Sequence, residues 1–260
     1  MDDRLDVITI PLLRDNYGYL LADRARGTAV VIDPSEAEPV QRALEAEQLA
    51  LAAIWCTHHH WDHVGGIAEL VARWPGIEVL GSDHDARSSH IDGQTRGLAD
   101  GERVEHGGVT FEVIAIPGHT LGAIAYAGGG MVFTGDTLFL GGCGRVFEGT
   151  MPMMRASLAR LAGLAGETRV YCGHEYTMRN LDFAQHVEPG ERAIAERLEE
   201  VSAARAAGRA SVPGTLAEEL GTNPFLRWSS SAVRAFAASR GAADSDDEVF
   251  ARVREAKDSF

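Results

Sequence analysis

The sequence predicts an α/β domain followed by a smaller helical domain. A chain of 260 residues buries roughly 70–75% of its unfolded surface, which is enough for a large core and an appendage. Short apolar segments separated by Gly, Asp and Pro dominate up to residue 173, whereas Ala, Glu and Arg at helical spacing dominate from residue 174 onward. We therefore expect domains at residues 1–173 and 174–260.

The individual elements follow from the same patterns. In the first part, strands are expected at residues 7–10, 18–21, 28–33, 77–80 and 109–116. In the second part, helices are expected at residues 191–201, 230–240 and 248–257, separated by Pro213-Gly214 and Asn223-Pro224. No solenoid period and no low-complexity tract interrupts this order, so a repeat architecture is not expected.

The run Thr57-His58-His59-His60-Trp61-Asp62-His63 places three adjacent imidazoles, an aspartate and a fourth imidazole in one loop. An apolar strand precedes it at residues 51–56, and a helical pattern follows at 67–74 before Pro75-Gly76 ends it. Ligand sites in α/β sheets lie at the carboxyl ends of strands. A solvated His-rich loop is the alternative, but imidazole and carboxylate at this density indicate a metal site.

The spacing within this loop separates two groups of ligands. His58 and His60 are two residues apart and can share one side, which leaves His59 pointing away. Asp62 and His63 form a second group further along the chain. Two offset groups indicate two metal ions.

Three further polar residues follow an apolar strand and a glycine. They are His119 after Pro117-Gly118, Asp136 after Gly135, and His174 after Gly173. Glycine permits a tight turn and close backbone approach. Taken alone, each is equally typical of a capping Asp or a turn His, but three repeats in order indicate ligands. Seven ligands for two metals, with one carboxylate bridging, leave a position for water, as in a catalytic site.

The motifs THHHWDH, PGHT, FTGDTLF and YCGHEY, in this order, resemble the metallo-β-lactamase superfamily and, within it, the glyoxalase II (hydroxyacylglutathione hydrolase) family. The resemblance runs over nearly the full length and includes residues 14–17, 142–145, 147–150 and 254–260. It implies an αββα sandwich followed by a C-terminal helical domain that binds glutathione.

The resemblance also implies a ligand set. One metal is expected at His58, His60 and His119 and the other at Asp62, His63 and His174, with Asp136 bridging. The cofactors are two divalent ions, with zinc expected and iron or manganese left open, because N/O sites select by availability as much as by affinity. Asp33, at the end of a strand, is a candidate partner of these ligands, although a turn-forming Asp before Pro34 is an equal alternative.

For the substrate, the resemblance implies glutathione contacts from Arg145, His174, Tyr176, Arg254 and Lys257. Arg254 and Lys257 are three apart and so neighbours on one helical face, where they can bind a carboxylate. From the residues alone, the alternative is that Arg254 and Lys257 do not bind substrate and are solvated cations favoured by the dipole at the C-terminal end of a helix. Phe147 stands where some relatives carry Tyr, so a hydroxyl contact to the tripeptide is missing or supplied otherwise.

The expected reaction is hydrolysis of S-D-lactoylglutathione, and of related 2-hydroxyacyl-glutathiones, to glutathione and D-lactate, the second step of methylglyoxal detoxification. Hydroxide held by two metals would attack the thioester, with Asp62 orienting it. The leaving thiol has a pKa of roughly 8.5, so no strong acid is needed. A mononuclear-iron glutathione persulfide dioxygenase of the same fold is the alternative enzyme, and a silent metal-binding module is the alternative from another class.

The composition of the chain limits which partners it can bind and where in the cell it is expected. With 24 basic and 38 acidic residues the formal charge is −14, which argues against nucleic acid. Cys56, Cys143 and Cys172 are odd in number and lack C-x-x-C spacing, so we expect reduced, structural thiols. Without a signal segment or an apolar stretch of 18 residues, a cytoplasmic monomer that does not bind membranes is expected.

Overall fold

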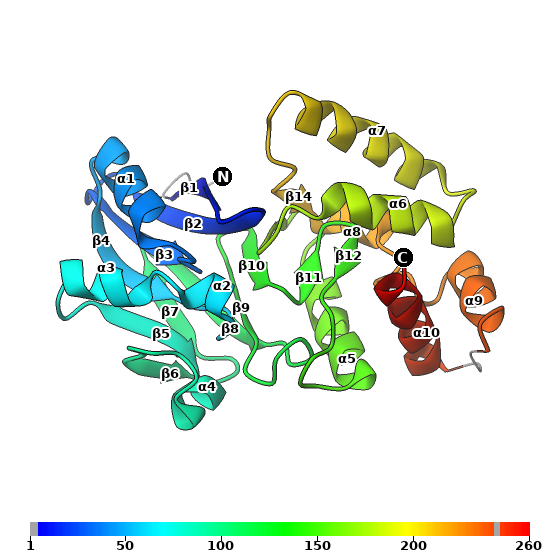
Figure 1. The fold of residues 1–260 in the computed structure, drawn as a ribbon, viewed down its shortest axis with the longest axis horizontal. Helices are drawn as coiled ribbons and strands as arrows, with labels where there is room; N and C mark the ends of the chain where they lie inside the picture. Colours follow the sequence, from blue (N-terminus) through cyan, green and yellow to red (C-terminus); the bar gives the residue numbers. More distant parts are fainter. Residues whose placement is uncertain (1–4, 242–244) are drawn as a thin grey trace. The chain divides into compact units, whose positions relative to one another are not determined.

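The computed structural model describes residues 5–241 and 245–260, and the chain divides into two compact units (Figure 1). The first unit comprises Met1–Ala115 with Gly122–Gly135, and the second comprises Ile116–Leu121 with Asp136–Phe260. Residues 1–4 of the expected first domain lie outside the described residues. The domain boundary expected at residues 173/174 stays a prediction.

A six-stranded sheet in the first unit places the polar loops of interest at one edge. Its strands lie in sequence order: β1 (Asp6–Leu12), β2 (Asn16–Asp23), β3 (Thr28–Ile32), β4 (Ala50–Trp55), β5 (Glu78–Ser82) and β6 (Arg96–Leu98). The first three strands pair antiparallel, and β3 to β6 pair parallel. Because parallel strands end at the same edge, the segments after β3, β4 and β5 come together there.

Helices occupy the connections between the parallel strands. They are α1 (Ala37–Glu47), α2 (Trp61–Val64), α3 (Ile67–Arg73) and α4 (Asp83–Ser88). Val40 and Leu44 of α1 and Leu70 of α3 pack with Leu20 and Ile54 of the sheet in one buried core. Figure 1 shows α1 and α3 beside this sheet. The apolar spacing of these helices thus fixes them on one face of the sheet.

The first unit contains four consecutive strands of a second, six-stranded sheet. They have the order β7 (Arg103–His106), β8 (Val109–Ala115), β9 (Ile124–Gly128) and β10 (Met131–Gly135) and are all antiparallel. Aromatic rings join these strands to the first sheet. Trp55 of β4 stacks on Tyr126 of β9 at 5.0 Å and meets Phe111 of β8 edge-on at 5.3 Å. Since side chains alternate along a strand, Trp55 faces this second sheet while Ile54 faces the helices. The result is a sandwich of two sheets.

The second unit is mainly helical. Its helices are α5 (Met151–Ala162), α6 (Thr177–Val187), α7 (Arg192–Ala206), α8 (Leu216–Thr222), α9 (Ser231–Ala238) and α10 (Asp246–Asp258). Its short strands pair as β11 (Leu138–Phe139) with β12 (Gly142–Cys143) and as β13 (Arg169–Cys172) with β14 (Gly214–Thr215). Figure 1 shows α6 beside α7, and Leu181, Ala184, Ile194 and Val201 form the core between them.

The expected helices at 191–201, 230–240 and 248–257 correspond to α7, α9 and α10, so these predictions are confirmed within a few residues. The expectation that residues 57–63 form a loop throughout is wrong in part. Residues 61–64 form the short helix α2, so Asp62 and His63 lie within its single turn. The sequence pattern thus predicted three helices of the second unit, but it did not predict α1 or α5.

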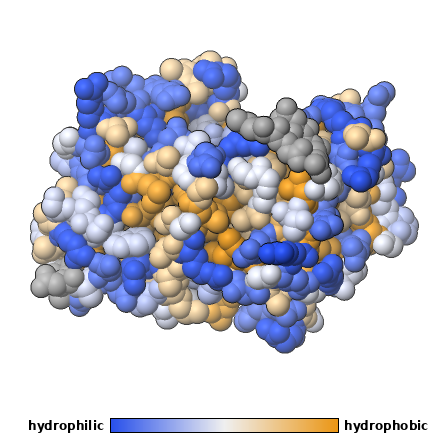
Figure 2. Space-filling model, turned by 180° about the vertical axis from the view of Figure 1, so that it is seen from behind, coloured by the Kyte–Doolittle hydropathy of each residue, from blue (hydrophilic) through white to orange (hydrophobic). Residues whose placement is uncertain are grey.

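The surface fits a chain in which 24% of residues are charged. Hydrophilic residues cover much of the face in Figure 2. Among the helices that could be assessed in residues 5–241 and 245–260, none is long and apolar enough to cross a membrane.

Candidate metal centre

Three imidazoles lie close together in the first unit, at the carboxyl end of β4. The ring centroids of His58 and His63 are 4.2 Å apart, and those of His58 and His60 are 4.8 Å apart. His58 and His63 are each 1% exposed, and His60 is partly buried. Such packing of imidazoles is costly for protonated rings, because like charges repel in a buried site, and it is typical of neutral rings that bind a metal.

The carboxylate of Asp33, which follows β3, fixes the orientation of two of these imidazoles. Its Oδ2 lies 3.0 Å from Nδ1 of His63 and accepts the hydroxyl hydrogen of Thr57 at 2.6 Å. Oγ1 of Thr57 in turn lies 3.1 Å from Nδ1 of His58. Because the Thr57 hydroxyl donates to Asp33, it accepts from His58. This assigns the hydrogens of both rings to Nδ1, so Nε2 of each ring carries the lone pair that can bind a metal.

The backbone around Asp33 explains how one carboxylate reaches both rings. Asp33 has a φ of 50° and is 2% exposed, and its Oδ1 accepts the backbone N–H of Thr57 at 2.8 Å. Gly135 permits an equally close approach, since a Cβ at that position would lie 2.3 Å from the Thr57 hydroxyl. The sequence left Asp33 as either a partner of the ligands or a turn residue, and the structure gives it hydrogen bonds typical of the former.

Asp62 is held by residues that the sequence analysis did not single out. Nδ2 of Asn16 donates to the Asp62 carboxylate at 3.2 Å and to its backbone carbonyl at 2.9 Å. The Ser35 hydroxyl also donates to that carbonyl. Asn16 begins β2, so its role depends on sheet pairing and not on local spacing. The Asp62 side chain is 24% exposed, which leaves part of it accessible to a substrate or to water.

His59 behaves as expected and turns to a different partner. Its Nδ1 lies 3.2 Å from Oδ1 of Asp85, at the start of α4. This carboxylate differs from Asp33, which fixes the hydrogens of His58 and His63.

The second unit brings its three predicted ligands together. Oδ2 of Asp136 lies 3.6 Å from Nε2 of His119 and 3.2 Å from Nε2 of His174. All three side chains are less than a tenth exposed. Nδ1 of His119 lies 2.8 Å from the Arg145 carbonyl, which can only accept, so this ring also carries its hydrogen on Nδ1. Asp136 thus lies between two imidazole nitrogens.

These residues fit divalent metal ions by their chemistry. A tetrahedral zinc site with bonds of about 2.0–2.1 Å has ligand atoms about 3.3 Å apart. The separations around Asp136 are close to this value. Three imidazoles with assigned Nδ1 hydrogens offer the neutral donors that zinc, iron and manganese sites use. Each unit therefore carries an incomplete set of metal ligands of suitable type.

The glycine before His119 has a clear structural reason. Gly118 has a φ of 155°, and a Cβ there would lie 2.8 Å from the backbone and side chain of Met154 on α5. The His119 segment is further held by Ser157, whose hydroxyl donates to the Pro117 carbonyl at 2.7 Å. Glycine is therefore required before His119 because the backbone packs closely against Met154, as the sequence pattern predicted.

Two of the predicted substrate contacts lie near His174 and Asp258. The Tyr176 ring stacks on the His174 ring with centroids 4.7 Å apart and an interplanar angle of 6°. The Arg145 side chain is largely exposed, and its Nε is 3.4 Å from Asp258. Phe147 is 62% exposed, and its ring centroid lies 5.2 Å from that of His119. The Arg145 and Phe147 side chains are therefore exposed, and the rings of Phe147 and Tyr176 lie beside His119 and His174, respectively.

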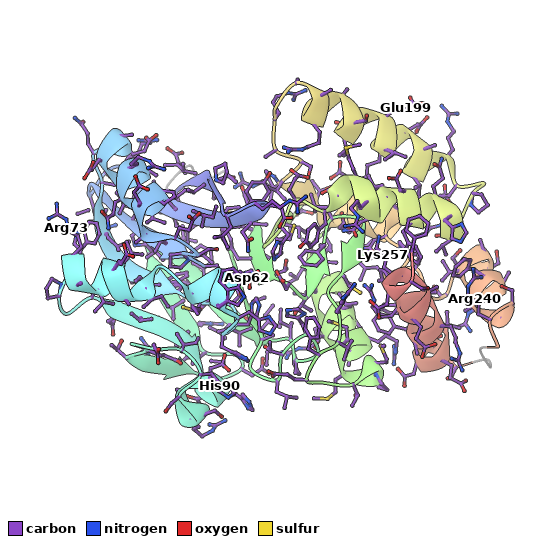
Figure 3. The ribbon with its side chains drawn as sticks, viewed as in Figure 1. Asp62, Arg73, His90, Glu199, Arg240 and Lys257 are labelled. Atoms are coloured by element: carbon purple, nitrogen blue, oxygen red, sulfur yellow. The ribbon has the colours of Figure 1, made fainter. Side chains whose placement is uncertain are left out.

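Arg254 and Lys257 share a face of α10 but differ in their environments. Arg254 is only 3% exposed, and it donates to the Cys143 carbonyl at 2.7 Å and to Asp258 at 3.0 Å. The alternative of a solvated helix-end cation is therefore wrong for Arg254. Lys257, labelled in Figure 3, donates to the Arg179 carbonyl at 2.9 Å and lies over the Phe183 and Phe260 rings. Burial, helped by the neighbouring Arg254, lowers its pKa to about 8.

The three cysteines are structural, as predicted. Cys56, Cys143 and Cys172 are all free and buried. Burial raises the pKa of Cys143 to about 11 and that of Cys172 to about 12, and it raises the pKa of Cys56 as well. A thiol that stays protonated and inaccessible cannot act as a nucleophile at neutral pH.

Comparison with known proteins agrees with this geometry. The family model of the metallo-beta-lactamase superfamily matches residues 14–174, and that of the hydroxyacylglutathione hydrolase C-terminus matches residues 175–260. Among solved structures, ETHE1 from Myxococcus xanthus is 27% identical with a TM-score of 0.65, and the match covers 97% of each chain. The fold and the ligand types define a member of the metallo-β-lactamase superfamily.

Similar proteins with curated names identify the family within this superfamily. A hydroxyacylglutathione hydrolase from Gloeobacter violaceus is 52% identical over 250 residues, which is 95% of this chain and 97% of that protein. One from Xanthomonas euvesicatoria pv. vesicatoria is 45% identical over 256 residues, covering 98% of both. The chain belongs to the hydroxyacylglutathione hydrolase (glyoxalase II) family of that superfamily.

Proposed function

We propose that the protein is a thioester hydrolase that converts S-D-lactoylglutathione and related 2-hydroxyacyl-glutathiones to glutathione and D-lactate or its analogues. The observation that carries this proposal is the match of residues 175–260 to the hydroxyacylglutathione hydrolase C-terminus, joined to relatives of that name over nearly the whole chain. A superfamily match alone would leave the substrate open, because one fold hosts many reactions.

The proposed cofactors are two divalent metal ions. We assign one ion to His58, His60 and His119, the other to Asp62, His63 and His174, and the bridging position to Asp136. The Nδ1 hydrogen bonds of His58, His63 and His119 support this assignment, since they leave Nε2 of each ring as the donor. Zinc is the proposed metal, with iron or manganese as alternatives that the same ligands accept.

When bound, two divalent ions lower the pKa of water toward neutrality and polarise a carbonyl oxygen. The chain supplies the positioning. Asn16 holds the Asp62 carboxylate, which can accept a hydrogen bond from the attacking water and orient it toward the thioester. Asp33 keeps His58 and His63 in one tautomer throughout the cycle. The leaving thiolate needs little proton donation, which agrees with the absence of a titratable side chain assigned to that task.

Substrate binding is proposed for the second unit, through Arg145, His174, Tyr176, Arg254 and Lys257. The Arg145 side chain is accessible for a carboxylate of glutathione, and the Tyr176 hydroxyl can donate to a peptide carbonyl. Lys257 is half-buried and retains most of its charge at pH 7. Arg254 is 3% exposed, so its proposed contribution is to hold Asp258 and the Cys143 carbonyl in place.

The physiological setting proposed is the second step of methylglyoxal detoxification in the cytoplasm, carried out by a monomer. Free, buried cysteines support a reducing compartment. A net charge of −14 does not favour the anionic substrate, so we expect attraction to arise locally from the metal ions and the cations named above.

The test is thioester hydrolysis combined with metal analysis of the same preparation. The protein with two metal equivalents is expected to release free thiol from S-D-lactoylglutathione, and chelation is expected to abolish the release. Full activity in a chelated, metal-free sample would contradict the mechanism. Oxygen consumption with glutathione persulfide and one iron per chain, with no thiol released from S-D-lactoylglutathione, would instead identify the dioxygenase that the named relatives do not favour.

A further inference from the structure

A second group of metal-binding side chains lies in the first unit, outside the seven ligands assigned above. It comprises His59 from the loop after β4, Asp85 of α4, and His90, which follows α4 and is labelled in Figure 3. One ligand atom of each residue lies within 4.8 Å of those of the other two. None of the three residues has a task in the proposed hydrolysis.

Asp85 is the centre of this group. Its Oδ1 lies 3.2 Å from Nδ1 of His59 and 3.2 Å from Nδ1 of His90, and the two rings are 4.5 Å apart. Asp85 is 0% exposed, and the Ser82 side chain helps to stabilise its carboxylate, yet Oδ2 has no hydrogen-bond partner of its own among the described residues. A buried carboxylate oxygen in that state is costly unless a further group, such as a cation, binds it.

The geometry also matches a coordination site better than a pair of ordinary hydrogen bonds. Two nitrogens 3.2 Å from one oxygen are at the long end of hydrogen-bond distances, whereas ligands around tetrahedral zinc are about 3.3 Å apart. Gly122 packs directly against the carboxylate, because a Cβ there would lie 2.3 Å from Oδ1. This contact limits rotation of Asp85 away from the two imidazoles.

We propose that His59, Asp85 and His90 bind one divalent transition metal ion, with zinc as the probe, in addition to the metals of the hydrolytic site. The two imidazoles and one carboxylate supply three ligands, and water supplies the fourth. The His90 side chain is 37% exposed and that of His59 is 17% exposed, so the ion enters from solvent. The site neutralises the one buried carboxylate of the group.

The experiment compares zinc binding by the full-length protein and the variant His90→Ala. Both are stripped of metal with a chelator, dialysed against zinc, and analysed for zinc per chain. We expect the wild-type protein to bind one more zinc per chain than His90→Ala. Because His90 is accessible, its removal should leave the fold intact, and a melting curve without added zinc checks this. Zinc should raise the Tm of the wild type more than that of the variant.

Two further variants make the result specific. His84→Ala removes a neighbouring ring on α4, 5.9 Å from that of His90, and should bind as much zinc as the wild type. Asp85→Asn keeps the shape but removes the charge, and should weaken the additional zinc by about 10-fold or more. Equal stoichiometry and affinity in the wild type, His90→Ala and Asp85→Asn would overturn the proposal and leave a hydrogen-bonded cluster. Because the readout is a difference in zinc, it is independent of thioester hydrolysis.

Discussion

The ligand loop of the first unit, residues 58–63, and the cations of α10 in the second unit both carry predicted functional residues, but they are held in different ways. In the loop, local spacing puts the ligands side by side, and a distant carboxylate then fixes their hydrogens. On α10, Arg254 is buried against a backbone carbonyl and Asp258, while Lys257 lies over aromatic rings. The hydrogen bonds of the imidazoles leave Nε2 available for the proposed metal ions, whereas the hydrogen bonds of the cations also stabilise the helix that carries them.

This difference predicts how each region responds to substitution. Loss of a metal ligand removes a group that takes part in the reaction, so the effect falls on metal content and kcat. Loss of a cation that binds a remote part of the substrate should fall chiefly on KM.

The largest effect is expected for Asp136→Ala. Asp136 lies between His119 and His174, so its removal takes away the proposed bridge and leaves two imidazoles without their shared carboxylate. We expect retained metal to fall and hydrolysis to drop on the order of 100-fold or more. Metal analysis and thiol release on the same sample measure both. Asp182→Ala, an exposed aspartate of α6, is the matched control and should retain both. Unchanged turnover in Asp136→Ala would contradict the bridge.

A smaller effect in the same region is expected for Asp33→Asn. The amide keeps the size of the side chain but is a weaker acceptor for Nδ1–H of His63 and for the Thr57 hydroxyl, and its NH₂ group cannot accept at all. Metal affinity or activity should fall about 10–100-fold. Competition with a chelator of known affinity measures the change.

The control for that substitution is Asp23→Asn, which alters a buried aspartate of the same unit that pairs with Arg26. It should leave metal affinity unchanged. If Asp33→Asn also leaves metal affinity unchanged, Asp33 acts only as a turn residue before Pro34. Its hydrogen bonds would then stabilise the loop without affecting metal binding, as the contacts of Arg254 stabilise α10.

The ligand loop and α10 also differ in how far the sequence predicted them. Predicted ligands such as His58, His60 and His63 can be recognised in the sequence because they lie within six residues of one another. Asn16 was not singled out, since only the pairing of β2 with its neighbours brings it to Asp62. The burial of Arg254 was not predicted either, because helical spacing defines a face but not what covers that face. Local chemistry is readable from sequence, whereas contacts between distant segments require the fold.

The fold class follows the same rule. Strands such as β3 and β8 have strong apolar signals bounded by turn residues and were predicted, with ends that differ by a residue or less. The two-residue strands β11, β12 and β14 are too short to show a period, and their existence depends on pairing with another strand. Helix α2 spans only Trp61–Val64, so helical spacing could not reveal it within the ligand run.

The smallest expected effect tests the α10 side of the comparison, through the charge of Lys257. Its pKa of about 8 lies below the usual lysine value, so the ammonium is present below pH 8 and is lost as the pH rises above it. If Lys257 attracts a carboxylate of the substrate, KM should rise about 3- to 10-fold between pH 7 and pH 9. Initial rates of thioester hydrolysis at several substrate concentrations measure KM across this range.

Two variants separate the rise in KM caused by Lys257 from any change caused by titration of the substrate. The substrate titrates in the same way with every variant. Lys257→Met should show a raised KM at pH 7 and lack the lysine-dependent rise, whereas Lys257→Arg stays charged and should keep KM low up to pH 9. An identical pH profile of KM in the wild type and Lys257→Met would mean that Lys257 serves the helix alone, through the Arg179 carbonyl and the Phe183 and Phe260 rings. The α10 cations would then be structural, and substrate binding would rest on accessible groups such as Arg145 and Tyr176.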